Sequence, residues 1–196
     1  MRPLRESLVG EPVSRVMGIV NGTTNYILTK MAEEGWTYAA ALAEAQSLGY
    51  AERDPTADVE GFDAGAKAAI IATIAFGAKV VAGDVYHEGI SAITQTDIDF
   101  AARLGYVIKL LAIAERFEDG TVAVRVHPAM VPQAHPLAAV RDSFNAVFVQ
   151  GGAVGDLMFY GRGAGGFPTA SAVLGDVIDA AANLAKGTHA TLGTFG

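Results

Sequence analysis

The sequence predicts an α+β fold in which a mixed, largely antiparallel sheet is covered by helices on one face. Two observations predict it. The first half of the chain carries mainly helical segments that end at glycines, whereas the second half carries two pairs of strand-like runs, each joined by a short turn. Helices and strands therefore occur in blocks, and not in the strict alternation that gives a parallel sheet.

The first half begins with a strand. RVMGIV, residues 15–20, is a short β-type run that ends at the turn-like Asn21-Gly22. Residues 23–25, TTN, then offer N-cap side chains for a helix, and Gly35 is expected to end it.

More helices follow. Thr37 can cap the next one, which Gly49 closes in the same way. An acidic loop leads into a long helix expected over about residues 63–81. ISAIT, residues 90–94, is strand-like, and a helix over about residues 96–104 comes after it.

The second half predicts two hairpins and a closing helix. The turn EDG, residues 118–120, lies between VIKLLAIAERF and TVAVRVHPAMV. Gly151-Gly152 lies between NAVFVQ and AVGDLMFYG in the same way. The last helix is PTASAVLGDVIDAAANLAKG, with Thr169 or Ser171 as its expected N-cap.

Composition narrows the class of protein. Hydrophobic residues make up 51% of the 196 residues and charged residues 18%, which is typical of a globular chain with a real core. A net charge of −7 argues against binding to nucleic acid or to an anionic membrane surface. The chain has no cysteine, which excludes disulfides and a cysteine nucleophile. A cytoplasmic location is the default expectation.

The stretch ERDPTADVEGFDAGAK, residues 52–67, concentrates carboxylates ahead of one lysine. An EF-hand alignment that starts at Thr56 argues against calcium, because it puts Lys67 where a bidentate carboxylate is required. A simpler alternative is that Asp54 and Glu60 only stabilise a helix N-terminus through its dipole. That alternative does not account for Lys67.

Lys67 lies among alanines, so we expect its stem to be buried on a small-residue surface, where an ammonium needs a carboxylate partner. Asp63 is four residues earlier on the same helical face, within pairing reach. The pair is either a structural salt bridge or a proton donor with the carboxylate that orients it. The residues alone leave both alternatives open.

Three motifs in one order connect the chain to a known family: VMGIVNGTTNYIL, the acidic stretch above, and GRGAGGFPTASAVLGDV. From about residue 3 to about residue 189 the chain resembles the catalytic domain of homoserine dehydrogenase. The resemblance implies NAD(P)H-dependent reduction of L-aspartate 4-semialdehyde to L-homoserine, in the biosynthesis of threonine, methionine and isoleucine.

The resemblance also implies roles for single residues. Lys67 would protonate or orient the carbonyl oxygen, and Asp63 would hydrogen-bond the same oxygen and hold the lysine in place. Four residues would contact the amino-acid end of the substrate: Glu52, Asp58, Gly22 and Thr23.

The turn GRGAGG, residues 161–166, matches G-x-G-x-x-G between a strand and a helix, a context in which backbone N–H groups attract anions. No strand follows that helix, so a complete dinucleotide-binding unit is not expected here. The resemblance implies that Gly161, Gly163 and Gly165 touch the cofactor. No metal site is expected, because four scattered histidines form no zinc motif: His87, His127, His135 and His189.

The expected organisation is a linker over residues 1–14, a catalytic and dimerisation domain over 15–160, the glycine turn and a return helix over 161–187, and a tail over 188–196. The resemblance implies that the return helix packs on a Rossmann-type nucleotide-binding domain, which this chain lacks along with any ACT domain. We therefore expect the isolated chain to be inactive. The resemblance implies that any sodium site belongs to the full-length enzyme. A homodimer through the sheet is expected. The alternative is an interaction module without catalytic residues.

Overall fold

The computed structural model describes residues 1–188 and confirms the α+β prediction. One sheet contains six strands, which are β1 (Val13–Ile19), β2 (Tyr86–His87), β3 (Tyr106–Arg116), β4 (Val122–Pro132), β5 (Phe144–Gly151) and β6 (Gly155–Arg162). Their spatial order is β2-β4-β3-β1-β5-β6. Every neighbouring pair is antiparallel except β2 and β4, which are parallel.

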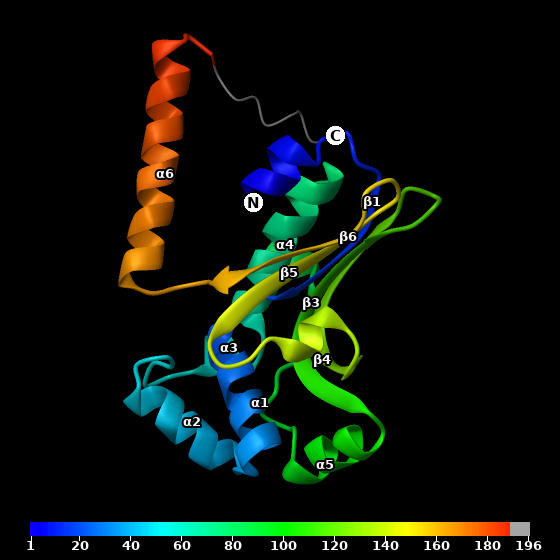
Figure 1. Cartoon of the computed structure of the whole chain (residues 1–196), viewed down its shortest axis with the longest axis vertical. Helices are drawn as coiled ribbons and strands as arrows, with labels where there is room; N and C mark the ends of the chain where they lie inside the picture. Colours follow the sequence, from blue (N-terminus) through cyan, green and yellow to red (C-terminus); the bar gives the residue numbers. More distant parts are fainter. Residues whose placement is uncertain (189–196) are drawn as a thin grey trace.

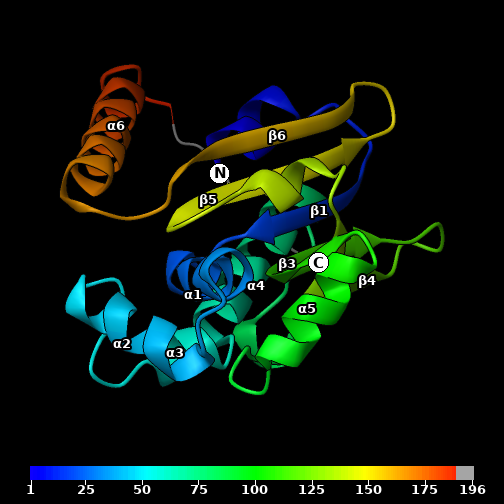
Figure 2. The same ribbon diagram turned by 60° about the horizontal axis from the view of Figure 1, so that its bottom comes forward.

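Five helices gather on one side of the sheet, as Figure 2 shows. They are α1 (Gly22–Glu34), α2 (Tyr38–Ser47), α3 (Thr56–Val59), α4 (Phe62–Phe76) and α5 (Gln95–Arg103). There are also three short helical segments: η1 (Pro3–Ser7), which precedes β1, and η2 (Ala82–Asp84) and η3 (Pro136–Ala139), which connect other elements. The two predicted hairpins are present as β3–β4 and β5–β6.

The core lies between these helices and the sheet. Ile27 and Met31 on α1 are fully buried, and they share one apolar cluster with Val16 of β1 and Val126 of β4. A smaller cluster covers part of the opposite face, where Leu137 of η3 packs with the sheet. Strand alternation accounts for the two clusters, because successive side chains point to opposite faces.

The last helix, α6 (Gly166–Ala185), stands apart from the rest of the molecule (Figure 1). None of its residues is buried. Its polar link to the body runs to the N-terminal segment, where Arg2 donates to Asp176 at 2.8 Å and Arg5 lies 3.9 Å from Asp179. Within residues 1–188, no helix combines the length and apolarity needed to cross a bilayer.

Two predicted elements are wrong. The long helix does not reach residue 81, because Gly77 adopts a positive φ of 65° and ends α4 at Phe76. Residues 90–94 form no strand, since they make a turn that leads into α5. Thr94 is the N-cap of α5, and Asp97 completes a reciprocal capping box with it, so the helix begins earlier than expected.

The N-caps of two other helices also differ from expectation. Residues 23–25 lie inside α1, and the cap is Asn21, whose Oδ1 accepts from the Thr24 N–H at 2.9 Å. Thr169 and Ser171 lie inside α6, which begins after Gly165 without a side-chain cap. Thr37 caps α2 as predicted.

Candidate active site

A pocket of about 490 Å³ opens where the end of β1, the start of α4 and the turn after β6 come together. It brings together residues that lie more than a hundred positions apart in the sequence. Every site residue predicted from the sequence lines it except Gly161: Gly22, Thr23, Glu52, Asp58, Asp63, Lys67, Gly163 and Gly165.

Gly161 lies within β6, opposite Asn145 of β5, and is not part of the pocket lining. The first glycine of the G-x-G-x-x-G match is therefore a strand residue, and the turn proper begins after Arg162. The pattern identified the turn correctly but extended it two residues too far toward the N-terminus.

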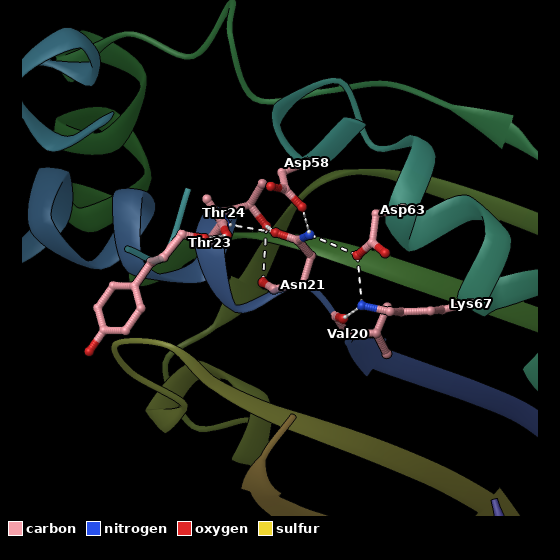
Figure 3. A network of polar contacts seen from close by, with 8 residues as sticks. Val20, Asn21, Thr23, Thr24, Asp58, Asp63 and Lys67 are labelled. Atoms are coloured by element: carbon pink, nitrogen blue, oxygen red, sulfur yellow. Dashed lines mark hydrogen bonds and ion pairs between the residues drawn. The ribbon is translucent and has the colours of Figure 1, made fainter. Parts of the chain in front are cut away.

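Lys67 and Asp63 form the predicted pair, one helical turn apart on α4 (Figure 3). The Lys67 Nζ donates to Asp63 Oδ2 at 2.7 Å and to the Val20 carbonyl at 3.0 Å. The expectation that Lys67 is buried is wrong, because its side chain is 46% exposed. Ala64, Ala68 and Ala69 are buried, whereas Ala66 and Lys67 are exposed, and Lys67 lines the pocket.

Asn21 connects the acidic residues to the helix that follows it (Figure 3). Its Nδ2 donates to Asp58 Oδ1 at 2.7 Å and to Asp63 Oδ2 at 2.8 Å. The sequence analysis treated Asn21 only as a turn residue and missed this bridge. Asparagine directly before a helix is a capping signal, but nothing in the local sequence indicates that its amide reaches two aspartates on other helices.

The start of α1 forms another wall of the pocket. Thr23 Oγ1 donates to the Tyr50 carbonyl at 2.6 Å, which ties this helix to the loop that carries Glu52. The backbone N–H groups of Gly22 and Thr23 belong to the first turn of α1, where helical geometry supplies no intrahelical acceptor. Those two groups suit an anionic ligand, since the helix dipole also favours negative charge there.

The turn after β6 forms the facing wall. A Cβ added to Gly163 would lie 2.1 Å from Asn145 Nδ2, so a larger residue would force the Asn145 side chain to move. The Arg162 guanidinium lies over the Phe144 ring, with 4.9 Å between its Cζ and the ring centroid. The N-terminus of α6 begins immediately after the turn, at Gly166. This wall therefore presents backbone and one cation, which fits a ligand with a phosphate or an amide.

The pocket thus brings together the carboxylates of Glu52, Asp58 and Asp63, the ammonium of Lys67, and backbone of the first turn of α1 and of the turn after β6. Such a set can bind a small zwitterion and transfer a proton to it. Within residues 1–188, no group of three or more acidic or histidine residues is arranged to hold a metal ion. Residues 189–196, which include His189 and most of the predicted tail, lie outside the described residues.

The family model for homoserine dehydrogenase matches residues 1–178. The chain belongs to the homoserine dehydrogenase family. A homoserine dehydrogenase of Corynebacterium glutamicum is 59% identical over 192 residues, which cover 96% of this chain and 43% of that protein. A homoserine dehydrogenase of Bacillus subtilis is 51% identical over 188 residues, which cover 95% of this chain and 43% of that protein. The chain therefore spans less than half the length of these relatives.

Solved structures agree with this assignment. The crystal structure of a homoserine dehydrogenase from Thiobacillus denitrificans superposes with a TM-score of 0.88 at 47% identity, over 91% of this chain and 41% of that one. A hyperthermophilic archaeal homoserine dehydrogenase in complex with NADPH superposes with a TM-score of 0.77 at 33% identity, over 93% of this chain and 51% of that one. The family resemblance predicted from the three motifs is confirmed.

Proposed function

We propose that the pocket binds L-aspartate 4-semialdehyde and its product L-homoserine, and that this chain supplies the substrate side of an NAD(P)H-dependent homoserine dehydrogenase. The reaction serves the biosynthesis of threonine, methionine and isoleucine. One observation carries the proposal: the ammonium of Lys67 and the carboxylate of Asp63 lie 2.7 Å apart at a pocket of about 490 Å³, which admits a four-carbon amino acid.

Lys67 is the proton donor of the reduction. An ammonium carries three N–H donors, and Asp63 and the Val20 carbonyl take two of those of Lys67. The third is free to donate to the aldehyde oxygen. A bound nicotinamide cofactor would supply the hydride to the aldehyde carbon. Lys67 gives a proton to the carbonyl oxygen, so the product is a primary alcohol. The side chain regains a proton from solvent, since it is 46% exposed.

Asp63 orients the lysine and the reacting oxygen. Its Oδ2 accepts from Lys67 and from Asn21, while Oδ1 accepts no hydrogen bond from the described residues. Oδ1 is therefore available to the hydroxyl of the product. Holding donor and acceptor in place before the reaction is worth more than their pairwise attraction, because no reorganisation is then needed in the transition state.

The other residues of the pocket match the two charged ends of the substrate. The substrate ammonium meets the carboxylates of Glu52 and Asp58, and the substrate carboxylate meets the first-turn N–H groups of Gly22 and Thr23. Gly163 and Gly165 line the pocket and would contact a bound nicotinamide cofactor through their backbone. The role given to Gly161 rests on the family resemblance alone.

The decisive variant is Lys67→Ala. The chain would replace the corresponding segment of the Corynebacterium glutamicum relative, and homoserine oxidation would be followed by absorbance of the reduced cofactor. We expect the chimera with Lys67 to turn over and the Lys67→Ala chimera to lose about 100-fold or more in kcat, because general acid–base catalysis contributes that much. Lys79→Ala is the matched control, since Lys79 is an exposed lysine outside the pocket.

The same experiment also tests the alternative function. An interaction module without catalytic residues of its own predicts that Lys67→Ala leaves turnover intact. Isothermal titration of L-homoserine into the chain by itself adds a measurement that needs no cofactor. If Lys67→Ala and Lys79→Ala change the affinity for homoserine equally, the proposed substrate pocket is contradicted.

We also propose that the chain forms a homodimer through the face of the sheet opposite the five helices. Met158 and Tyr160 of β6 support this, because both are exposed and share the face of their buried strand partners Phe148 and Ala146. The cytoplasmic location and the sodium ion stay predictions from composition and family. So do the boundaries at residues 14, 160 and 187.

A further inference from the structure

We propose that Asn21 is a positioning residue, whose amide group holds the carboxylates of Asp58 and Asp63 in the arrangement that the substrate and Lys67 require. The proposal rests on the function proposed above and deepens it. Asn21 does not touch the reacting atoms in this arrangement. It acts through two carboxylates on two different helices, α3 and α4.

The orientation of the Asn21 amide follows from its partners on both sides. On one side, the Thr24 N–H and hydroxyl lie 2.9 and 3.0 Å from Oδ1, and a backbone N–H can only donate. On the other side, two carboxylate oxygens lie 2.7 and 2.8 Å from Nδ2, and ionised carboxylates only accept. A flipped amide would set donor against donor and acceptor against acceptor, so the network allows one orientation.

This side chain is also rigid. Asn21 is 5% exposed, and both hydrogens of its amide are used by the two aspartates. Its oxygen caps α1, so the amide is anchored to the helix that forms one wall of the pocket. Buried polar groups with every hydrogen bond satisfied hold a unique geometry.

The consequence for the pocket concerns charge. Asp58 and Asp63 are like charges on neighbouring helices, and like charges repel strongly where solvent is partly excluded. Asn21 gives each of them one N–H donor, and Lys67 gives Asp63 a second. With these oxygens occupied, the second oxygen of each carboxylate is left for a ligand: Asp63 Oδ1 for the hydroxyl and Asp58 Oδ2 for the ammonium.

Two substitutions separate this role from helix capping. Serine and aspartate cap helices about as well as asparagine, so Asn21→Ser and Asn21→Asp keep the start of α1. Asn21→Ser removes the two N–H donors. Asn21→Asp keeps the shape of the side chain but faces Asp58 and Asp63 with a third carboxylate. If Asn21 only filled space, the isosteric Asn21→Asp would be the milder change. Positioning of the carboxylates predicts the reverse order.

The first measurement uses this chain alone and no substrate. Nuclear magnetic resonance of the Lys67 ammonium and of the Asp58 and Asp63 carboxyl carbons at pH 7 reports whether the network is intact. We expect these resonances to move in both Asn21 variants and to stay in place in Thr94→Ala. Thr94→Ala is the matched control, since it removes the N-cap of α5 outside the pocket. Unchanged resonances in both Asn21 variants would overturn the proposal.

The second measurement uses homoserine. In the chain we expect both Asn21 variants to weaken homoserine binding by about 10-fold or more, and in the chimera to lower kcat by about the same factor, with Asn21→Asp lower than Asn21→Ser. Losses no larger than those of Thr94→Ala would overturn the proposal. If the unsubstituted chain binds no homoserine but the resonances still move in the variants, the proposed function fails and the positioning of the carboxylates by Asn21 is supported.

Discussion

Lys67 and Lys109 differ in exposure and in hydrogen-bond partners. Lys67 is half-exposed and pairs with Asp63 at the pocket. Lys109, on β3, is 2% exposed, and its Nζ donates to Asn25 Oδ1 at 3.0 Å and to the Val140 carbonyl at 2.5 Å. Within residues 1–188 it forms no ion pair with a carboxylate. Burial therefore lowers the pKa of Lys109 to about 8, only partly offset by the charge of Glu33.

This lowered pKa predicts a pH dependence of stability. An unfolded lysine has a pKa of 10.5, so between about pH 8 and 10.5 the folded chain has released the Lys109 proton and the unfolded chain has not. The free energy of unfolding then rises with pH. The total gain is on the order of 3 kcal/mol. Urea unfolding at intervals from pH 7.5 to 9.5 should show this rise.

Lys109→Met is the comparison for that measurement, because it keeps the length of the side chain and removes the proton. Its free energy of unfolding should be flat over the same range. The window stops at pH 9.5 because tyrosines of the unfolded chain begin to titrate above it. Tyr26 then works in the opposite direction, since burial and its hydrogen bond to Glu44 raise its pKa to about 12. An equal rise in both proteins would contradict the role of Lys109.

At the scale of single elements, α6 differs from all the others. Its apolar side chains are largely exposed, among them Leu174 at 59% and Ile178 at 60%. A helix with an uncovered apolar face is expected where another element normally covers it. This fits the prediction that α6 packs on a nucleotide-binding domain, as the family resemblance implies. The exposed ion pair of Arg2 with Asp176 adds little stability of its own.

The free energy of unfolding of the chain alone should therefore not depend on the apolar face of α6. We expect Leu174→Gln and Ile178→Gln to change the free energy of unfolding of the body by less than about 0.5 kcal/mol, as for surface positions. Ile27→Ala, in the core, should lower it by about 2–5 kcal/mol. The fluorescence of Trp36, the single tryptophan, follows unfolding of the body in urea. A loss above about 2 kcal/mol from the α6 variants would show that α6 packs on the body.

At the scale of the whole molecule, the two faces of the sheet are covered unequally. Helices α1, α4 and α5 pack on one face, with α2 packed on α1, whereas the other face is covered in part by η3. Charged groups continue that second face beyond the apolar cluster, where Glu115 lies between Arg15 and Arg125. A half-covered sheet with apolar and charged zones suits a second copy of the same chain, because a two-fold interface pairs each zone with its counterpart.

The proposed dimer can be tested by sedimentation equilibrium. We expect the mass of two chains, and we expect Met158→Asp to weaken association by about 10-fold or more, because it would bury an unpaired charge at the interface. Ile70→Asp is the control, since Ile70 is exposed on α4, on the helical side of the sheet. A monomeric parent chain, or equal dissociation constants for the two variants, would contradict this interface.

The sequence by itself determined the class of fold, the two hairpins, the family, and most of the residues that meet at the pocket. These depend on local chemistry: strand alternation, glycine turns, and the four-residue spacing that puts Asp63 and Lys67 on one face of a helix. The prediction from the sequence was wrong where a single residue interrupts a periodic pattern, as Gly77 does at the end of α4.

Only the tertiary structure decided how far Lys67 is exposed, that Gly161 lies outside the pocket, and that Asn21 bridges two aspartates. Each of these depends on contacts between segments that are distant in the chain. Burial and hydrogen-bond partners are set by what folding brings alongside a residue, and the spacing of its neighbours in the sequence does not contain that information.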